Sequence, residues 1–289
     1  MPHSSVPRRL APLALLLSAC AADPTNIYDP LDPEVAPITE GEWSRFEITT
    51  TWQWQLTTAE GVADIDTSYD VDVYDIDLFE VPAEQIAALQ AEGRAVICYF
   101  SAGSWEEWRE DAAAFDERDI GKDLEGWAGE RWLNIRSPAV FEQMLARLDL
   151  AVSKGCDGVE PDNVEGYAES TGFLLTASDQ LAFNRRLANA AHERGLAIAL
   201  KNAGSQASEL VEYFDFSLNE QCHEYDECDQ LQPFLAAGKP IFNAEYVEPD
   251  TEAKALELAA TLCPRAQAEQ IRTLILPLDL DDRFRVSCD

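Results

Sequence analysis

Residues 178–202 read SDQLAFNRRLANAAHERGLAIALKN, and this stretch shows the pattern that decides the fold. Apolar residues recur at helical spacing over Ser178–Arg194, which predicts a helix with one buried face. Gly195 is placed to stop that helix, and Ala197–Asn202 then predicts a strand that is apolar on both faces. A helix that leads through a short link into such a strand is typical of a parallel sheet covered by helices on both sides.

The same alternation repeats from about residue 50 to the C-terminus. The predicted strands are Thr51–Leu56, Val71–Phe79, Arg94–Ser101, Gly158–Pro161, Ala197–Asn202, Phe214–Asn219, Pro240–Glu245 and Thr273–Leu278. The predicted helices include Pro82–Gly93, Ser178–Arg194, Ser208–Tyr213, Gln230–Ala237 and Thr251–Leu262. Eight such units predict an α/β fold, a single-domain (β/α)8 TIM barrel. An open doubly wound sheet is the alternative, but the sequence lacks its glycine-rich phosphate-binding turn.

One region departs from this alternation. Residues 104–150 follow the third predicted strand, and we expect them to hold more than one helix. The region also contains a cluster of tryptophans: Trp105, Trp108, Trp127 and Trp132. We interpret it as an elaborated loop region over the mouth of the barrel.

The composition of the chain limits the classes of partner that it can bind. Its 289 residues include 54 acidic and 21 basic residues, which gives a net charge of −33. Such a chain repels the phosphates of DNA and RNA, so no nucleic-acid partner is expected. The charge fits a cationic partner, although adaptation to salty surroundings would explain it as well. We expect a monomer.

The N-terminus has the layout of an export signal. Two arginines precede the apolar stretch Leu10–Leu17, and small residues follow it. The segment Leu17–Cys20 resembles a bacterial lipobox, which implies removal of residues 1–19 and lipidation of Cys20. The alternative is an ordinary signal peptide that is cleaved elsewhere.

Residues 20–42 are rich in proline and predict an extended tether between the lipid and a barrel domain over residues 43–289. No apolar run is long enough for a spanning helix, so contact with a membrane is expected only through the lipid anchor. These features predict a bacterial cell-envelope protein, anchored at the outer membrane or cell surface, or a secreted one.

The remaining cysteines are consistent with export. Without Cys20, six cysteines are left, and an even number in an exported chain suggests disulfides. Sequence proximity favours the pairs Cys222–Cys228 and Cys263–Cys288, which leaves Cys98–Cys156. Buried free thiols are the alternative. A metal site is not expected, because no CxxC pair occurs.

Polar residues follow the apolar strands, where a barrel enzyme builds its site. The candidates are Trp54, Asp75, Asp77, Tyr99, Asp162, Asn163, Lys201, Asn202, Glu220, Glu245, Tyr246 and Asp279. Carboxylates that face each other across the mouth, with aromatic and amide side chains beside them, predict a sugar-cleaving site. The alternative is that a very acidic chain simply carries acids everywhere.

Histidine chemistry is disfavoured by the surroundings of the histidines. His192 lies mid-helix and is expected on the solvent face. His223 follows the sixth predicted strand, but no GxSxG elbow accompanies it, so a serine hydrolase is not indicated.

Four segments together resemble glycoside hydrolase family 114: Tyr74–Asp77, Val96–Gly103, Gly158–Asn163 and Leu218–Cys222. The similarity extends from about Trp52 to Leu280. It implies a (β/α)8 barrel with endo-α-1,4-polygalactosaminidase activity on a galactosamine-containing exopolysaccharide, with no cofactor.

The resemblance implies Asp162 and Glu220 as the catalytic pair, and substrate binding by Lys201-Asn202 and by Asn243–Tyr246. Glu220 is interpreted as the proton donor, because an apolar strand and neighbouring acids would raise its pKa. Asp162 would stay ionised. Two other functions stay open: a non-catalytic polysaccharide-binding lipoprotein on the same barrel, and a glycosidase for another amino-sugar polymer.

Overall fold

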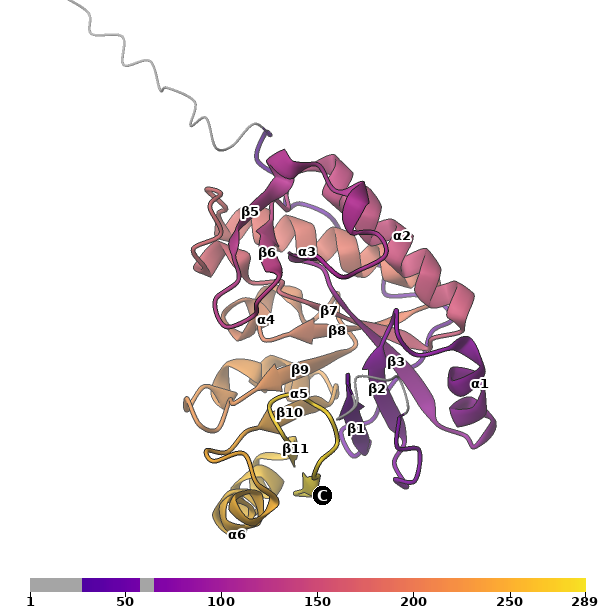
Figure 1. Cartoon of the computed structure of the whole chain (residues 1–289), viewed down its shortest axis with the longest axis vertical. Coiled ribbons are helices and arrows are strands. Elements are labelled where there is room, and N and C mark those ends of the chain that lie inside the picture. Colours follow the sequence, from indigo (N-terminus) through magenta and orange to yellow (C-terminus); the bar gives the residue numbers. More distant parts are fainter. Residues whose placement is uncertain (1–27, 58–64) are drawn as a thin grey trace, which may run out of the picture.

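The computed structural model describes residues 28–57 and 65–289, and its centre is a curled sheet with eight parallel strands (Figure 1). In spatial order these strands are β1 (Trp52–Gln55), β2 (Val73–Asp77), β3 (Ala95–Ser101), β7 (Gly158–Asp162), β8 (Ala197–Lys201), β9 (Phe216–Glu220), β10 (Ile241–Glu245) and β11 (Arg272–Ile275). Each overlaps one of the predicted strands, so the predicted TIM-barrel-like fold is confirmed. The predicted leader and Cys20 lie outside the described residues.

The seam between the first and last parallel strands is made by the C-terminal segment. The short strand β12 (Val286–Ser287) pairs antiparallel with β11. The amides of Leu56 and Thr57 donate to the carbonyl oxygen of Leu280 at 3.1 and 3.2 Å. Within the described residues no strand ladder joins β11 directly to β1, so the barrel is closed by loop contacts at this point.

Helices cover the outside of the sheet. They are α1 (Ala83–Ala91), α2 (Pro138–Lys154), α3 (Ala177–His192), α4 (Ala207–Leu210), α5 (Gln232–Ala236) and α6 (Glu252–Glu269). Alternate strand residues point to opposite faces. Outward residues such as Tyr74 and Ile198 therefore join the core under the helices, whereas Trp52, Phe216 and Phe242 fill the barrel interior.

The region after β3 is a small sheet rather than a set of helices. β4 (Ser104–Glu106), β5 (Ile120–Asp123) and β6 (Glu130–Leu133) pair antiparallel in the order β4-β6-β5. Two 3₁₀ turns interrupt them, and the one α-helix of the predicted region, α2, begins at Pro138. The expected helices are therefore α2 and two short 3₁₀ helices, and the three strands were not predicted, because strands of three or four residues are too short to show a clear period.

Buried ion pairs hold this inserted sheet against the barrel. Arg109 lies 2.6 Å from Asp77 of β2 and 2.8 Å from Glu106 of β4. Arg147 of α2 approaches Glu106 at 3.5 Å and Asp111 at 2.8 Å. Buried charges are tolerated when they are paired in this way, so the insert has a defined position over the strand ends.

Residues 28–42, the described part of the predicted tether, lie on the surface of the domain. Their backbone is bonded along α3: the amide of Leu31 donates to Asp179 at 3.0 Å, and the amide of Ile38 donates to Asn189 at 2.9 Å. A free spacer between lipid and barrel could therefore include only residues before this docked segment.

The expected solvent exposure of His192 was wrong. Its ring is buried, donates from Nδ1 to the carbonyl oxygen of Ile38, is hydrogen-bonded through Nε2 to Asp215, and stacks on Trp43 with ring centroids 4.0 Å apart. The N-terminal segment covers this face of α3, which the sequence pattern of the helix alone does not reveal.

The three predicted disulfides are confirmed. Cys98–Cys156 ties β3 to the chain after α2, Cys222–Cys228 closes the loop after β9, and Cys263–Cys288 ties α6 to the C-terminus. Across residues 28–57 and 65–289, no helix is both long and apolar enough to cross a bilayer.

Candidate active site

A cleft of about 740 Å³ lies over the carboxyl ends of the barrel strands. Residues of six barrel strands line it, namely Trp54, Asp77, Tyr99, Asp162, Lys201 and Glu220, and the inserted sheet forms one of its walls. The residues that carry charge or an aromatic ring along it are Trp54, Asp77, Glu80, Tyr99, Glu106, Trp108, Arg109, Trp127, Glu130, Asp162, Glu165, Lys201, Glu220, Tyr225, Tyr246 and Asp279.

The ammonium group of Lys201 is the centre of the site. Its side chain is buried at the end of β8, and Nζ lies 2.9 Å from Glu160 and 3.3 Å from each of Asp162 and Glu220. The two nearest oxygens of Asp162 and Glu220 are therefore at most 6.6 Å apart, twice that distance. The structure brings together the two carboxylates that the sequence comparison had paired.

Each of these two carboxylates is also held by neutral donors. The Tyr99 hydroxyl donates to Asp162 Oδ2 at 3.0 Å. The Asn202 amide donates to Glu220 Oε2 at 3.0 Å, and the Tyr246 hydroxyl donates to Glu220 Oε1. Such partners orient the carboxylates before any ligand binds.

The pKa of Glu220 is lowered, which contradicts the reason for which it was interpreted as the proton donor. Burial raises the pKa of this carboxyl, but the charge of Lys201 and the hydrogen bonds from Tyr246 and Asn202 outweigh the burial. The ammonium group that faces Glu220 comes from a different strand, so the residues around Glu220 in the sequence do not reveal it.

Other acids in and below the cleft favour the protonated form. Burial raises the pKa of Glu160 to about 7, despite the opposing charge of Lys201. Burial and the charge of Glu160 raise the pKa of Asp75 well above its usual value. Burial, with Asp162 and Glu220 nearby, raises the pKa of Glu165 to about 8.

Three neighbouring strands present their charged residues through the same local geometry. Asp162, Lys201 and Glu220 are each followed by a residue in the left-handed conformation: Asn163 (φ 60°), Asn202 (φ 52°) and Gln221 (φ 57°). Asparagine tolerates this conformation better than most residues. Gly103 is required beside one of these turns, because a Cβ there would lie 1.8 Å from the carbonyl oxygen of Asn163.

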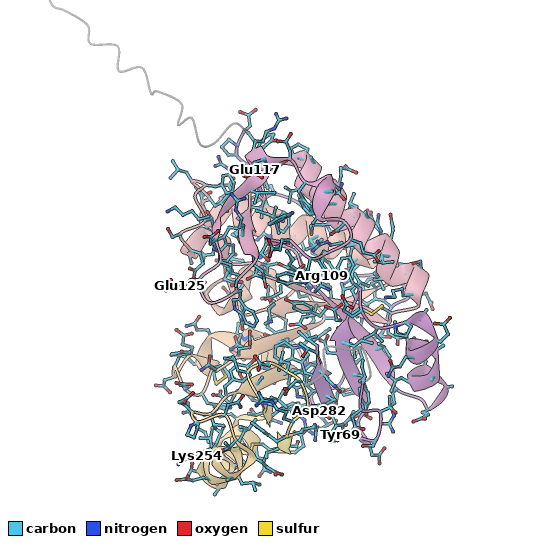
Figure 2. All side chains as sticks on the ribbon, in the orientation of Figure 1. Tyr69, Arg109, Glu117, Glu125, Lys254 and Asp282 are labelled. Atoms are coloured by element: carbon cyan, nitrogen blue, oxygen red, sulfur yellow. A yellow bond between two sulfur atoms is a disulfide. The ribbon has the colours of Figure 1, made fainter. Side chains whose placement is uncertain are left out.

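The walls of the cleft carry exposed aromatic rings. Trp108 and Trp127 of the inserted region are 51% and 53% exposed, and Tyr225 on the loop after β9 is 62% exposed. The cluster of tryptophans in residues 104–150 had indicated that this region lies over the mouth of the barrel. Nothing in the sequence pointed to Arg109, which Figure 2 shows in the middle of the molecule, or to Glu165.

Eight of the ten predicted substrate-binding residues line the cleft, namely Trp54, Asp77, Tyr99, Asn163, Lys201, Asn202, Tyr246 and Asp279. Asp75 and Glu245 do not line it. Asp75 is buried below Lys201, beside Glu160. Asp77 is at the wall, but its carboxylate is occupied by Arg109.

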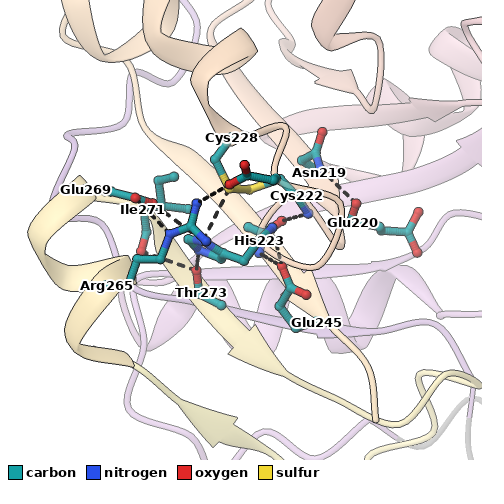
Figure 3. Close-up of a disulfide and its surroundings, with 12 residues drawn as sticks. Asn219, Glu220, Cys222, His223, Cys228, Glu245, Arg265, Glu269, Ile271 and Thr273 are labelled. Carbon is teal, nitrogen blue, oxygen red and sulfur yellow. Dashed lines mark hydrogen bonds and ion pairs between the residues drawn. A yellow bond between two sulfur atoms is a disulfide. The ribbon is translucent and has the colours of Figure 1, made fainter. Parts of the chain in front are cut away.

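Glu245 ends β10, beside the strand that ends at Glu220, and contacts the loop after β9 (Figure 3). Its Oε1 accepts from the amide of His223 and from the side chain of Asn243, both at 2.9 Å. It supports the loop after β9 and is not in position to meet a ligand in the cleft. The pleat causes this, because Tyr246 and Glu245 point to opposite faces.

His223 lies in the same supporting cluster and not in the cleft. With Cys222 and Cys228 it forms a close group of potential metal ligands among the described residues. The two sulfurs are bonded to each other, so they are not free to coordinate an ion.

A barrel with paired carboxylates at its strand ends and aromatic walls beside them is the architecture of a glycoside hydrolase. The model of glycoside-hydrolase family GH114 matches residues 33–289, and the chain belongs to this family.

The fold resembles solved structures of known proteins. The crystal structure of Ega3 from Aspergillus fumigatus, in complex with galactosamine, is 43% identical, covers 86% of this chain and 99% of its own, and superposes with a TM-score of 0.79. The glycoside hydrolase domain of PelA from Pseudomonas aeruginosa has the same fold at 15% identity, with a TM-score of 0.64 over 82% of this chain and 98% of its own. An uncharacterized protein of Deinococcus radiodurans is 28% identical over 235 residues, which are 71% of this chain and 74% of that protein.

Proposed function

We propose that the protein hydrolyses internal α-1,4 links of a galactosamine-containing exopolysaccharide. The observation that carries the proposal is the pair Asp162 and Glu220, which share the ammonium group of Lys201 at the bottom of an acidic cleft. The galactosamine in the complex of the 43% identical structure supports the choice of sugar. A net charge of −33 would concentrate a polycationic chain at the protein.

The chemistry needs two carboxyl groups. One protonates the departing glycosidic oxygen, and the other either attacks the anomeric carbon or activates water. Carboxyl groups about 5–5.5 Å apart act with retention, whereas inversion needs about 6.5–9.5 Å to admit water between them. The upper bound of 6.6 Å on the nearest oxygens of Asp162 and Glu220 takes in the whole retaining range and only the lower edge of the inverting one, so we propose a retaining mechanism.

Cleavage within a chain needs binding of several sugar units. The exposed rings of Trp108 and Trp127 on one wall and of Tyr225 on the loop after β9 offer apolar faces for such units. A cleft with stacking surfaces away from the carboxylates suits a long polymer.

We also propose that the protein is anchored at the bacterial cell envelope by lipid on Cys20. The support is the sequence of the segment Leu17–Cys20, since this part of the chain lies outside the described residues. A docked segment that begins by Leu31 leaves only about ten residues between the lipid and the domain surface. The active site would then act close to the envelope.

The test uses purified protein with partly deacetylated galactosaminogalactan, beside chitosan and poly-N-acetylglucosamine. We expect shorter oligomers only from the first polymer, and proton NMR of the new reducing ends should show the α anomer first. Asp162→Asn and Glu220→Gln should each lower turnover by several orders of magnitude. Glu257→Gln, on the exposed face of α6, is the matched control and should leave turnover unchanged.

Two results would decide for the other functions. Binding of galactosaminogalactan without any cleavage would indicate a non-catalytic binding protein. Cleavage of chitosan or poly-N-acetylglucosamine in preference would indicate a glycosidase for a different amino-sugar polymer. Azide rescue of alanine variants at the two positions would assign the nucleophile, because azide replaces a missing carboxylate nucleophile.

A further inference from the structure

We propose that Glu165 receives the ammonium group of the sugar bound beside Asp162 and Glu220, and thereby selects deacetylated sugar units. The inference rests on the proposed function, because it concerns how the same cleft recognises its substrate.

The position of Glu165 fits this role. It comes three residues after Asp162, in the turn that follows β7, and its side chain lines the cleft. Its Oε2 atom is buried and has no hydrogen-bond partner. Among residues 28–57 and 65–289, no lysine, arginine or histidine forms an ion pair with it, whereas Asp162 and Glu220 both have Lys201.

Most of the charges that act on the Glu165 carboxyl are negative. Lys201 is the cation that acts on it, but Lys201 already contacts Glu160, Asp162 and Glu220 within 3.3 Å. The other charges that act on Glu165 are Asp162, Glu220 and Glu169, all of which disfavour its ionised form. With burial, they raise the pKa of Glu165 to about 8, so it holds a proton at neutral pH in the free protein.

An incoming ammonium group changes this balance. A cation beside the carboxyl favours the ionised form, so Glu165 should give up its proton to solvent as the amino sugar binds. The buried oxygen then gains a charged donor, and the ammonium group gains a carboxylate. An N-acetyl group has no charge and leaves the proton in place, so the acetylated sugar obtains no such ion pair.

The experiment measures binding and proton release together. Calorimetric titration of the full-length protein with galactosamine, N-acetylgalactosamine and galactose at pH 6.5, in two buffers with different heats of ionisation, gives the number of protons released. We expect release approaching one proton with galactosamine and none with the other two sugars.

The variants separate this role from others. Glu165→Gln should weaken galactosamine binding by at least about tenfold, abolish the proton release and leave binding of N-acetylgalactosamine unchanged. Glu165→Asp keeps the charge and should retain part of the preference and of the release, which guards against a folding defect. Glu257→Gln removes one exposed negative charge on α6, is not among the charges that act on Glu165, and is the matched control.

Two outcomes would overturn the inference without touching the proposed function. If wild-type protein cleaves galactosaminogalactan but Glu165→Gln keeps the galactosamine preference and the proton release, Glu165 does not bind the ammonium group. If Glu165→Gln loses turnover by orders of magnitude with unchanged binding, Glu165 acts in the chemical step instead. Failure of the wild-type protein to cleave any of the polymers would refute the proposed function and not this binding role.

Discussion

Replacing Lys201 by methionine removes the one ammonium group that faces three carboxylates. Lys201→Met keeps the length and the apolar stem of the side chain, so the change in packing is small. Glu160, Asp162 and Glu220 would then stand within a few ångströms of one another without a cation. We expect their protonated forms to be favoured and turnover to be nearly lost.

The expected destabilisation follows from burial. The side chain of Lys201 is 2% exposed and that of Glu160 is not exposed, so solvent screens their interaction little. Removing one partner of such a buried pair costs about 3–5 kcal/mol. For a domain of this size that corresponds to a fall in melting temperature on the order of 10 °C.

The stability lost in Lys201→Met should depend on pH, and its direction follows from the pKa of Glu220. In the wild type the pKa of Glu220 is lowered, so this carboxylate contributes stability that is present above its unfolded pKa and is lost as pH falls through the folded value. In Lys201→Met the folded pKa is instead expected to lie above the unfolded value. The variant should therefore lose less stability relative to the wild type at pH 4 than at pH 8.

The assay is guanidinium denaturation at pH 4, 6 and 8 with the disulfides intact. Lys254→Met is the matched control, because Lys254 is 45% exposed, forms an exposed ion pair with Glu257 and lies at the outer edge of the molecule (Figure 2). It should change stability by less than about 1 kcal/mol at any pH. An equal loss for Lys201→Met at pH 4 and pH 8, or near-normal turnover, would refute the electrostatic account of the site.

Three further predictions concern the site and the anchor. Tyr246→Phe removes a hydrogen bond that lowers the pKa of Glu220, so the limb of the pH–rate profile that reports Glu220 should move to higher pH. The acidic limb should move if activity requires the ionised carboxylate, and the alkaline limb if it requires the protonated form. An unchanged profile would contradict the prediction. Trp127→Ala should raise KM for long polymers about fivefold, through loss of about 1 kcal/mol of stacking, and leave short oligomers unaffected; an equal effect on both would argue against a remote sugar site. Cys20→Ser should release the protein from membrane fractions or block its processing, and unchanged membrane association would exclude the lipid anchor.

The sequence alone was sufficient for the order of the eight parallel strands, because each is specified by a local run of apolar residues and by glycines such as Gly195 that stop the preceding helix. It was also sufficient to place Asp162, Lys201 and Glu220 at strand ends, since parallel strands deliver their last residues to one face of the barrel. The pairing of the cysteines followed from chain proximity, which local loops such as the one closed by Cys222 and Cys228 preserve.

The tertiary structure decided the electrostatics and the walls of the site. The pKa of Glu220 depends on Lys201, which lies 19 residues earlier in the chain. The sequence around either residue does not predict how close the two side chains come in space. The unpaired state of Glu165 and the burial of His192 under the N-terminal segment likewise depend on which distant segments meet. Local periodicity determines elements because it acts between neighbours in the chain, whereas charge and burial act between neighbours in space.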